Sequence, residues 1–571
     1  MRILATAVLV VLALVVPRMQ AQQIFGTIDL FDTTSVSPGQ GTGYIIWSSD
    51  RTTLSYRITY NNLAGTFSAA HFHAASNRGV LQAITFVGKT ATGTWTLVDS
   101  VANLLSDEGV YVNIHTSTAP GGEIAGTVRL RQGGFGIALD GPQAGTNSSG
   151  MGTGYATLDG GAGSNDLTYR LTYAGLRATR SAAHFHSLPG GGVVHDLGTS
   201  FTDSTADGVW VGVPDSVIAK LFRSQIYANI HTSASPGGEI RGSTSVVGEF
   251  PAAGSLTPVA GVTSTALGTA WAVLRPNVSV VYSATYQGLA GTYQAAHFHR
   301  LPSASVVQAV IFSNGHASGT WSGLTDQDVA DFTAGRLYLN IHSSVATGGE
   351  IAAELIPNDG VVMATLDGAQ AGTASTGRGS AWGMFANDSM AYALTFTGLQ
   401  GTYQASHFHL APAGTVLAPI TPILNNTAIG WWDPGVNFMN LLRGNVYVNI
   451  HSSTAPSGEI RGNLKLGSGT TVTGVEEMSI EVPQAFSLSQ NYPNPFNPTT
   501  TIEFVLARAE RVTLKVFNVL GQTVVTLVNE EREAGVHRTT FDATKLTSGV
   551  YFYSLSGAAG SIQTKRMLLV K

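Results

Sequence analysis

The chain has 571 residues, with 30 Lys or Arg against 35 Asp or Glu, so its formal net charge is −5. Without a basic excess it lacks the electrostatic footprint of a nucleic-acid-binding protein, and we expect no nucleic-acid partner. Charged residues make up only 11% of the chain and hydrophobic residues 43%, which excludes a charged, disordered chain. Cysteine is absent, so disulfides, thiolate metal ligands and a cysteine nucleophile are excluded.

The first 21 residues have the organisation of a secretory signal peptide. Arg2 precedes an uncharged apolar run over residues 3–16, and Pro17 ends that run. The run is shorter than the roughly 20 residues of a membrane-spanning helix, and Ala21 is a small residue at a suitable cleavage position. We therefore predict export and removal of residues 1–21, with an uncleaved anchor as the alternative. No other segment predicts a transmembrane span.

The central part of the chain consists of four tandem repeats. Each repeat contains His-Phe-His, then Gly-x-Trp, then Asn-Ile-His, then Gly-Glu-Ile, in the same order. A period of roughly 110 residues is that of a whole domain rather than of a solenoid unit. We predict repeats at residues 22–131, 132–248, 249–358 and 359–466, a linker at 467–485, and a separate C-terminal domain at 486–571.

Each repeat has the pattern of antiparallel β-structure. Before the first His-Phe-His, the apolar residues Leu54, Tyr56, Ile58 and Tyr60 alternate with polar ones, which is typical of a strand with one buried face. Glycine-rich turns separate such segments. One short helix is predicted before Asn-Ile-His, for example at residues 99–105 and 215–222. The predicted fold class is all-β: four tandem Greek-key sandwiches or barrels, followed by a small β-sandwich.

These motifs also resemble those of a known family. The pattern Ala-Ala-His-Phe-His, followed by Tyr-x-Asn-Ile-His-x-Ser-x-x-Pro-Gly-Gly-Glu-Ile-x-Gly, resembles the CHRD domain, a module named after chordin. The third repeat departs from it at Thr347 and Ala353, and the fourth at Ser406 and Ser457. The family carries no bacterial activity that we transfer, and growth-factor binding by chordin should not transfer, because its cysteine-rich modules are absent here.

Three histidines recur in every repeat, and we predict that they converge. In a strand, residues i and i+2 share a face, so His71 and His73 project together, opposite Phe72. His115 likewise projects opposite Ile114. A carboxylate always follows eight residues after the third histidine. The candidate metal-ligating sets are therefore His71, His73, His115 and Glu123; His184, His186, His231 and Glu239; His297, His299, His342 and Glu350; and His407, His409, His451 and Glu459.

Three interpretations of these sets stay open. In the first, three imidazoles bind copper or zinc, and the glutamate is a fourth ligand or orients one ring. In the second, the histidines form a structural hydrogen-bond network, and in the third they are a solvated face without a role. The His-x-His pair is also similar to that of copper/zinc superoxide dismutases. The cysteine pair and an obvious bridging histidine of those enzymes are missing, so we do not predict dismutase activity.

The C-terminal segment resembles a second family. The segments NYPNPFNPTTTIEF, VFNVLGQTV, TSGVYFYSL and KRMLLVK, in this order, are similar to the type A sorting domain of the type IX secretion system. About seven short strands over this segment suit a small β-sandwich. The resemblance implies a Gram-negative bacterium, the type IX machinery as a partner, removal of this domain, and release from or attachment to the outer cell surface.

The sequence thus leads to two hypotheses about function. The first is a non-enzymatic, secreted or surface-attached protein whose four modules bind an unknown surface ligand or act in adhesion, with avidity from the tandem copies. The second is an extracellular copper- or zinc-binding metalloprotein, with metal-dependent redox activity as a less favoured extension. No other catalytic motif recurs, and one carboxylate per repeat does not suit a two-carboxylate mechanism.

Overall fold

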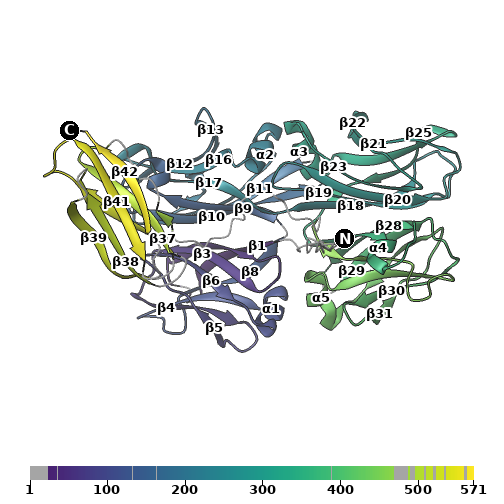
Figure 1. Ribbon diagram of the computed structural model, residues 1–571, viewed down its shortest axis with the longest axis horizontal. Helices are drawn as coiled ribbons and strands as arrows, with labels where there is room; N and C mark the ends of the chain where they lie inside the picture. The colour runs from purple at the N-terminus through teal and green to yellow at the C-terminus, as the bar shows by residue number, and fades with distance from the viewer. Residues whose placement is uncertain are drawn as a thin grey trace, which may run out of the picture. The chain divides into compact units, whose positions relative to one another are not determined.

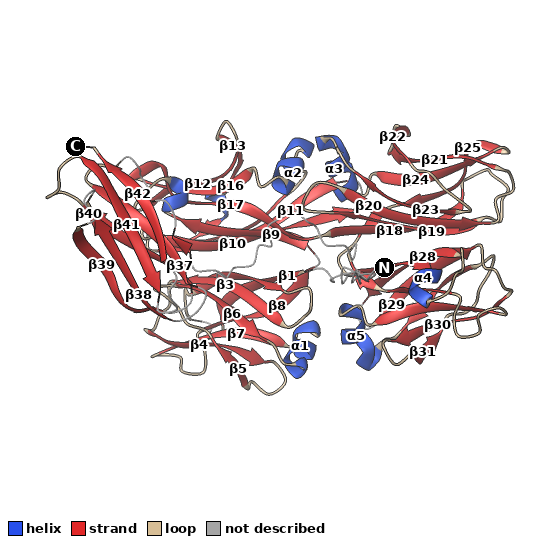
Figure 2. Ribbon diagram, viewed as in Figure 1, coloured by secondary structure: helices blue, strands red, loops and turns tan. Residues whose placement is uncertain are grey.

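The computed structural model describes residues 23–34, 36–131, 133–161, 164–386, 389–467, 487–488, 491, 496–506, 510–518, 522–532, 535–557 and 562–570. The predicted signal peptide and most of the predicted linker lie outside these residues. The chain divides into two compact units, residues 1–475 and 476–571. The described residues are dominated by strands, with a few short helices (Figures 1 and 2).

The first repeat forms one eight-stranded antiparallel sheet with the strand order β5-β4-β7-β8-β1-β2-β3-β6. A single helix precedes β7, where the sequence predicts it. The strands are β1 (Ile24–Asp32), β2 (Gln40–Trp47), β3 (Thr53–Asn61), β4 (Phe67–Ala74), β5 (Val80–Ala83), β6 (Thr90–Thr96), β7 (Val110–Thr116) and β8 (Ile124–Arg131), and the helix is α1 (Asp99–Ser106).

This sheet folds over on itself to enclose a core. Phe72 of β4 stacks on Trp95 of β6 with ring centroids 5.2 Å apart, although these strands are near opposite ends of the strand order. Tyr56 of β3 also contacts Phe72, edge to face. The recurring Trp therefore closes the core from the far end of the sheet. The structure confirms the predicted all-β class.

The other three repeats preserve this topology. In the second, the elements are β9 (Gly133–Asp140), β10 (Met151–Gly161), β11 (Ser164–Ala174), β12 (Arg180–Ser187), β13 (Gly192–Asp196), β14 (Phe201–Thr202), β15 (Thr205–Trp210), α2 (Asp215–Phe222), β16 (Ile226–Thr232) and β17 (Ser235–Gly248). In the third, they are β18 (Phe250–Pro258), β19 (Leu267–Leu274), β20 (Val280–Gln287), β21 (Tyr293–Arg300), β22 (Ser305–Ala309), β23 (His316–Trp321), α3 (Asp326–Thr333), β24 (Leu337–Ser343), β25 (Ala346–Glu354) and β26 (Ile356–Pro357). In the fourth, they are β27 (Val361–Asp367), α4 (Gly368–Ala371), β28 (Arg378–Ala386), β29 (Ser389–Thr397), β30 (Tyr403–Leu410), β31 (Thr415–Pro419), β32 (Thr427–Trp432), α5 (Phe438–Leu442), β33 (Val446–Ser452), β34 (Ile460–Asn463) and β35 (Lys465–Leu466).

The repeats contact one another through buried side chains. Phe222 of the second repeat packs on Phe250 of the third, with ring centroids 4.7 Å apart, and one apolar cluster spans both repeats. A second cluster spans the first and fourth repeats. Thr59 and Thr153 share a buried hydroxyl–hydroxyl hydrogen bond of 2.7 Å between the first and second repeats. The tandem repeats therefore lie in one compact unit and share apolar clusters.

The C-terminal unit has its own core. Its described strands form a three-stranded sheet, β36-β37-β40, and a four-stranded sheet, β39-β38-β41-β42. Apolar side chains of both sheets, among them Phe504 and Tyr553, pack together. The strands are β36 (Ser487–Leu488), β37 (Thr499–Leu506), β38 (Glu510–Phe517), β39 (Thr523–Arg532), β40 (Gly535–Asp542), β41 (Gly549–Gly557) and β42 (Ile562–Leu569).

Candidate metal centre

Two neighbouring strands of each repeat position the three histidines. In the first repeat, β4 and β7 pair so that His71 lies opposite Asn113, and His73 opposite Tyr111. The intervening residues Phe72 and Ile114 are fully buried in the core. The alternation of the two strands therefore turns the histidines to the face opposite the apolar core, as the sequence predicts, and His73 is itself buried there at 6% exposure.

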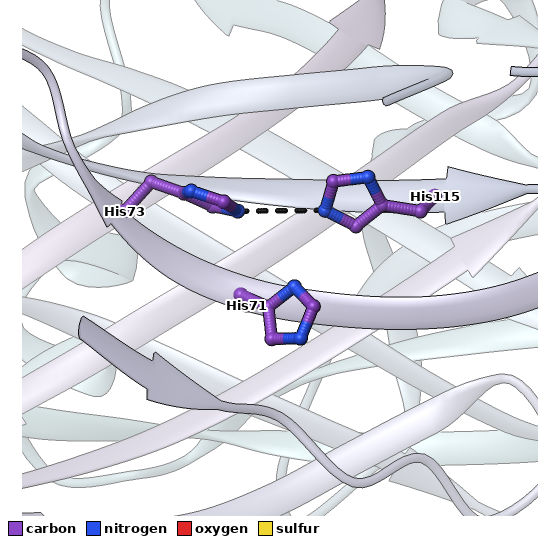
Figure 3. Close-up of side chains that lie close together, drawn as sticks. All are labelled: His71, His73 and His115. Atoms are coloured by element: carbon purple, nitrogen blue, oxygen red, sulfur yellow. Dashed lines mark hydrogen bonds between the residues drawn. The ribbon is translucent and has the colours of Figure 1, made fainter. Parts of the chain in front are cut away.

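The three rings then meet at one point on this face (Figure 3). In each repeat, one ligand atom from each of the three histidines lies within 4.8 Å of the other two. The predicted convergence is confirmed in all four repeats. The sets are His71, His73 and His115; His184, His186 and His231; His297, His299 and His342; and His407, His409 and His451.

The second and third histidines of each set are held by backbone carbonyls. His73 donates from Nδ1 to the carbonyl of Arg78, and His115 from Nδ1 to the carbonyl of Pro120, both at 2.9 Å. A carbonyl oxygen can only accept, so each Nδ1 carries a proton, and the Nε2 of the neutral ring is a bare lone pair. The same bonds, at 2.8–2.9 Å, occur in the other repeats for His186, His231, His299, His342, His409 and His451.

These bare nitrogens face each other. The Nε2 atoms of His73 and His115 are 3.4 Å apart, the contact drawn as a dashed line in Figure 3. Two neutral rings fixed in this way have no proton to share there, so the contact is a hydrogen bond only if one ring is doubly protonated. Two nitrogens bound to one tetrahedral zinc at 2.0–2.1 Å would lie about 3.3 Å apart. The spacing therefore suits a shared cation.

The first histidine contributes its other ring nitrogen. In the second, third and fourth repeats, its Nδ1 lies 3.1–3.3 Å from the Nε2 of the third histidine. In the first repeat, His71 Nδ1 is buried and has no hydrogen-bond partner in the described part of the chain. The candidate ligand set is therefore one Nδ1 and two Nε2 atoms.

The surroundings favour the neutral form of the first ring. Burial lowers the pKa of His71, and the nearby rings of His115 and His73 lower it further. The pKa values of His184, His297 and His407 are lowered for the same reasons. The ring of the second histidine, His73, is covered by Tyr111, which stacks on it with ring centroids 5.2 Å apart. A neutral imidazole is the form that binds metals.

Comparison with known families accounts for nearly the whole described chain. The model of the CHRD domain matches residues 30–128, 135–244, 251–355 and 362–464, which together are well over half of the chain. The chain belongs to the CHRD domain family. The model of the secretion system C-terminal sorting domain matches residues 490–570. The CHRD protein is therefore exported to the cell surface or beyond through the type IX secretion machinery. No helix in the described ranges has the length and apolarity needed to span a membrane.

The remaining comparisons are distant, and no curated protein matches the chain. Among solved structures, trypsin-activated alpha-2-macroglobulin from Escherichia coli is 9% identical with a TM-score of 0.15, over 98% of this chain and 40% of its own. PorZ of the Porphyromonas gingivalis type IX secretion system is 10% identical with a TM-score of 0.12, and the match covers 93% of this chain and 69% of PorZ. A tetra-tandem repeat of a large adhesion protein is 14% identical with a TM-score of 0.13, and the match covers 72% of this chain and 97% of that repeat structure. TM-scores this low establish neither a shared fold nor a shared function.

The structure does not bring the predicted glutamates into the histidine triads of the CHRD repeats. Glu123 is 1% exposed and accepts hydrogen bonds from Ser37, from Thr116 and from the backbone N–H groups of Ala64 and Gly65. Burial alone would raise the pKa of Glu123, but these hydrogen bonds outweigh it and lower the pKa. Glu239, Glu350 and Glu459 are similarly buried and hydrogen-bonded.

Glu123 instead joins the two ends of the loop that positions the third histidine, because its Oε2 accepts from Thr116 Oγ1 across residues 117–122. Asn113, beside the triad, donates from Nδ2 to the carbonyl of Gly121 in the same loop. Gly122 has φ of +119°, and a Cβ there would lie 2.0 Å from the Asn113 side chain. This close packing explains the glycine of the Gly-Glu pair, because the loop supplies the Pro120 carbonyl that holds His115.

Two groups of site residues were missed from the sequence. The carbonyl anchors carry no side-chain signal, although each lies five residues after its histidine. Thr347 replaces a proline at one of these positions without consequence, because only its backbone oxygen is used. The second group is Asp196, which lies 3.9 Å from His184 and occurs in one repeat only. The sequence offers one sign of it: Asp196 directly follows His195, a histidine that lies outside the shared motif.

Proposed function

We propose that this CHRD protein is an extracellular metal-binding protein with one tri-histidine site for copper or zinc in each repeat. The observation that carries the proposal is the pair of bare Nε2 atoms fixed 3.4 Å apart in three of the repeats. Such a pair repels unless a proton or a metal ion lies between the two lone pairs. The same carbonyl anchors in all four repeats hold the lone pairs toward the centre of the triad.

The ligand chemistry favours copper and zinc over harder ions. Imidazole nitrogen suits zinc and copper, whereas calcium and magnesium require oxygen ligands. The recurring carboxylate accepts hydrogen bonds from other partners and is not part of the triad, so three neutral ligands define the site. Because that carboxylate is also unavailable as a general base, we propose binding rather than catalysis as the function.

The adhesion hypothesis rests on the tandem copies and the surface destination, and it remains a prediction. A metal ion on an outward face could itself coordinate a side chain of a surface ligand, so the two functions are compatible. Metal binding is the one that the described side chains support.

The test is metal stoichiometry of the purified secreted protein. After removal of bound metal by a chelator, we expect the protein to take up to four equivalents of Cu²⁺ or Zn²⁺ at neutral pH. The double variant His71→Ala/His73→Ala should lose one equivalent. His316→Gln is the matched control, because His316 lies outside the triads and hydrogen-bonds to Thr285.

A folded protein that binds neither metal would overturn the proposal. In that case the triads are structural networks, and His71→Ala/His73→Ala should lower stability by roughly 1–3 kcal/mol through the polar groups left unpaired. Circular dichroism of each variant establishes that a loss of metal is not a loss of fold.

A further inference from the structure

The four triads differ at the residue opposite the first histidine. In the second repeat, the ladder between β12 and β13 pairs His184 with Asp196. Asp196 Oδ1 lies 3.9 Å from His184 Nε2. The registered positions in the other repeats are Ala83, Ala309 and Pro419, whose side chains have no polar atom. A carboxylate beside the ligand ring is thus a feature of one repeat.

The orientation of His184 makes this carboxylate relevant to metal binding. His184 directs Nδ1 to the centre of the triad, 3.3 Å from His231 Nε2. With a metal ion bound at Nδ1, the proton of the neutral ring would be on Nε2, which lies toward Asp196. At 3.9 Å this contact is longer than a hydrogen bond, so Asp196 acts on the ring as a nearby negative charge, which makes His184 a more basic ligand. The other two histidines of this repeat donate to the carbonyls of Gly191 and Pro236.

A positive charge near the second triad acts against metal binding, in the opposite direction to Asp196. Arg241 lies over the ring of Tyr227, 5.1 Å from its centroid, and Tyr227 stacks on His186. The fourth repeat has the same arrangement, with Arg461 over Tyr447 at 4.6 Å. The second and fourth repeats are therefore matched in this respect and differ at Asp196. Because Asp196 faces a ligand ring directly while Arg241 acts through an intervening ring, the carboxylate has the larger effect.

Resting on the proposed function, we infer that the second repeat holds the tightest of the four metal sites and fills first. Asp196 is the residue that determines this preference. The fourth repeat, with the arginine and without the carboxylate, holds the weakest site. The protein then binds metal over a range of free concentrations rather than at a single threshold.

The experiment is a Zn²⁺ titration of the metal-free secreted protein against a competing chromophoric chelator. We expect one equivalent to bind about tenfold more tightly than the rest, the lower end of the effect known for such carboxylates. Asp196→Asn keeps an oxygen to accept the 2.7 Å hydrogen bond from the Gly198 N–H but removes the charge, so the tight class should disappear. The matched control is Asp159→Asn, an exposed aspartate of the same repeat that hydrogen-bonds to Thr168.

A gain-of-function variant and two deletions complete the test. Ala309 is exposed and lies opposite His297, so Ala309→Asp should create a second tight site. His184→Ala/His186→Ala should delete the tight class, whereas His297→Ala/His299→Ala should delete a weaker equivalent. A wild-type protein that binds no zinc refutes the proposed function. Four wild-type sites of equal affinity, or a tight class that Asp196→Asn leaves unchanged, refute this inference alone.

Discussion

Replacing one buried carboxylate should measure how strongly the loop beside a triad is held. Glu350 is fully buried, and its Oε1 accepts hydrogen bonds of 2.6 Å from Ser264 Oγ and from the Ala290 N–H. Its Oε2 accepts from the Gly291 N–H at 3.3 Å. In Glu350→Gln, the amide oxygen can keep the first two partners, but its NH₂ group then faces the Gly291 N–H, donor against donor.

The size of the effect follows from these three bonds. A hydrogen bond to a charged group contributes about 1.5–3 kcal/mol and a neutral one about 1 kcal/mol, so two weakened bonds cost about 2 kcal/mol. An unpaired buried N–H costs at least about 1 kcal/mol more. We therefore expect Glu350→Gln to lower the free energy of unfolding by about 3 kcal/mol at pH 7.

The effect should depend on pH with a definite sign. Burial would raise the pKa of Glu350, but the hydrogen bonds outweigh it and hold the pKa below its ordinary value of 4.5. The carboxylate therefore stabilises the fold fully above pH 4.5, and this contribution is lost as the pH falls through the lower folded-state pKa. The difference between wild type and variant should shrink in acid.

Urea unfolding of the metal-free protein, followed by tryptophan fluorescence at pH 7 and near pH 3.5, measures this difference. Glu354→Gln is the control, since Glu354 is an exposed residue of the same strand, β25. A loss below about 0.5 kcal/mol, the usual range of surface substitutions, would refute the reasoning. So would an equal loss at both pH values.

Three further predictions concern the loop, the triads and processing. Gly349→Ala should destabilise the protein by roughly 1–3 kcal/mol, because φ is +126° and the new Cβ would lie 2.2 Å from Asn340, whereas Gly348→Ala meets nothing within 4 Å and should be neutral in the same thermal melt. When the protein is equilibrated at pH values between 7 and 5, the bound metal should be lost at pH values below about 6. The reason is that the pKa of His71 lies under its ordinary 6.5, so protons compete with the metal only in acid. Metal that stays bound at pH 5 would contradict this prediction. Peptide mapping of the extracellular protein should recover neither the first 21 residues nor peptides of the sorting domain, and intact ends would count against it.

Much of the fold and of the triads could be predicted because both depend on strand alternation. Phe72 between His71 and His73 fixes which face is buried, and a two-residue period leaves no freedom in where the histidines point. The helix at Asp215–Phe222 was predictable from its short apolar segment before a strand, and it forms at those residues.

The remainder depends on contacts between residues far apart in the chain. The constant spacing of Glu123 predicts a fourth ligand or an acceptor that orients one ring. Its partner Ser37 lies on another loop, and no pattern in the sequence connects the two. The packing of Phe222 on Phe250, across two repeats, was equally invisible, because each residue looks like an ordinary core position of its own repeat.

The carbonyl anchors also bear on how such a protein changes over evolutionary time. Every one of the eight donor–acceptor pairs spans five residues, from His73 to Arg78 in the first repeat through His451 to Pro456 in the last. The tautomers of two rings in each triad are thus fixed by contacts within their own repeat. Under the proposed function, duplication of a repeat would therefore add a complete triad whose carbonyl anchors need no residue of another repeat.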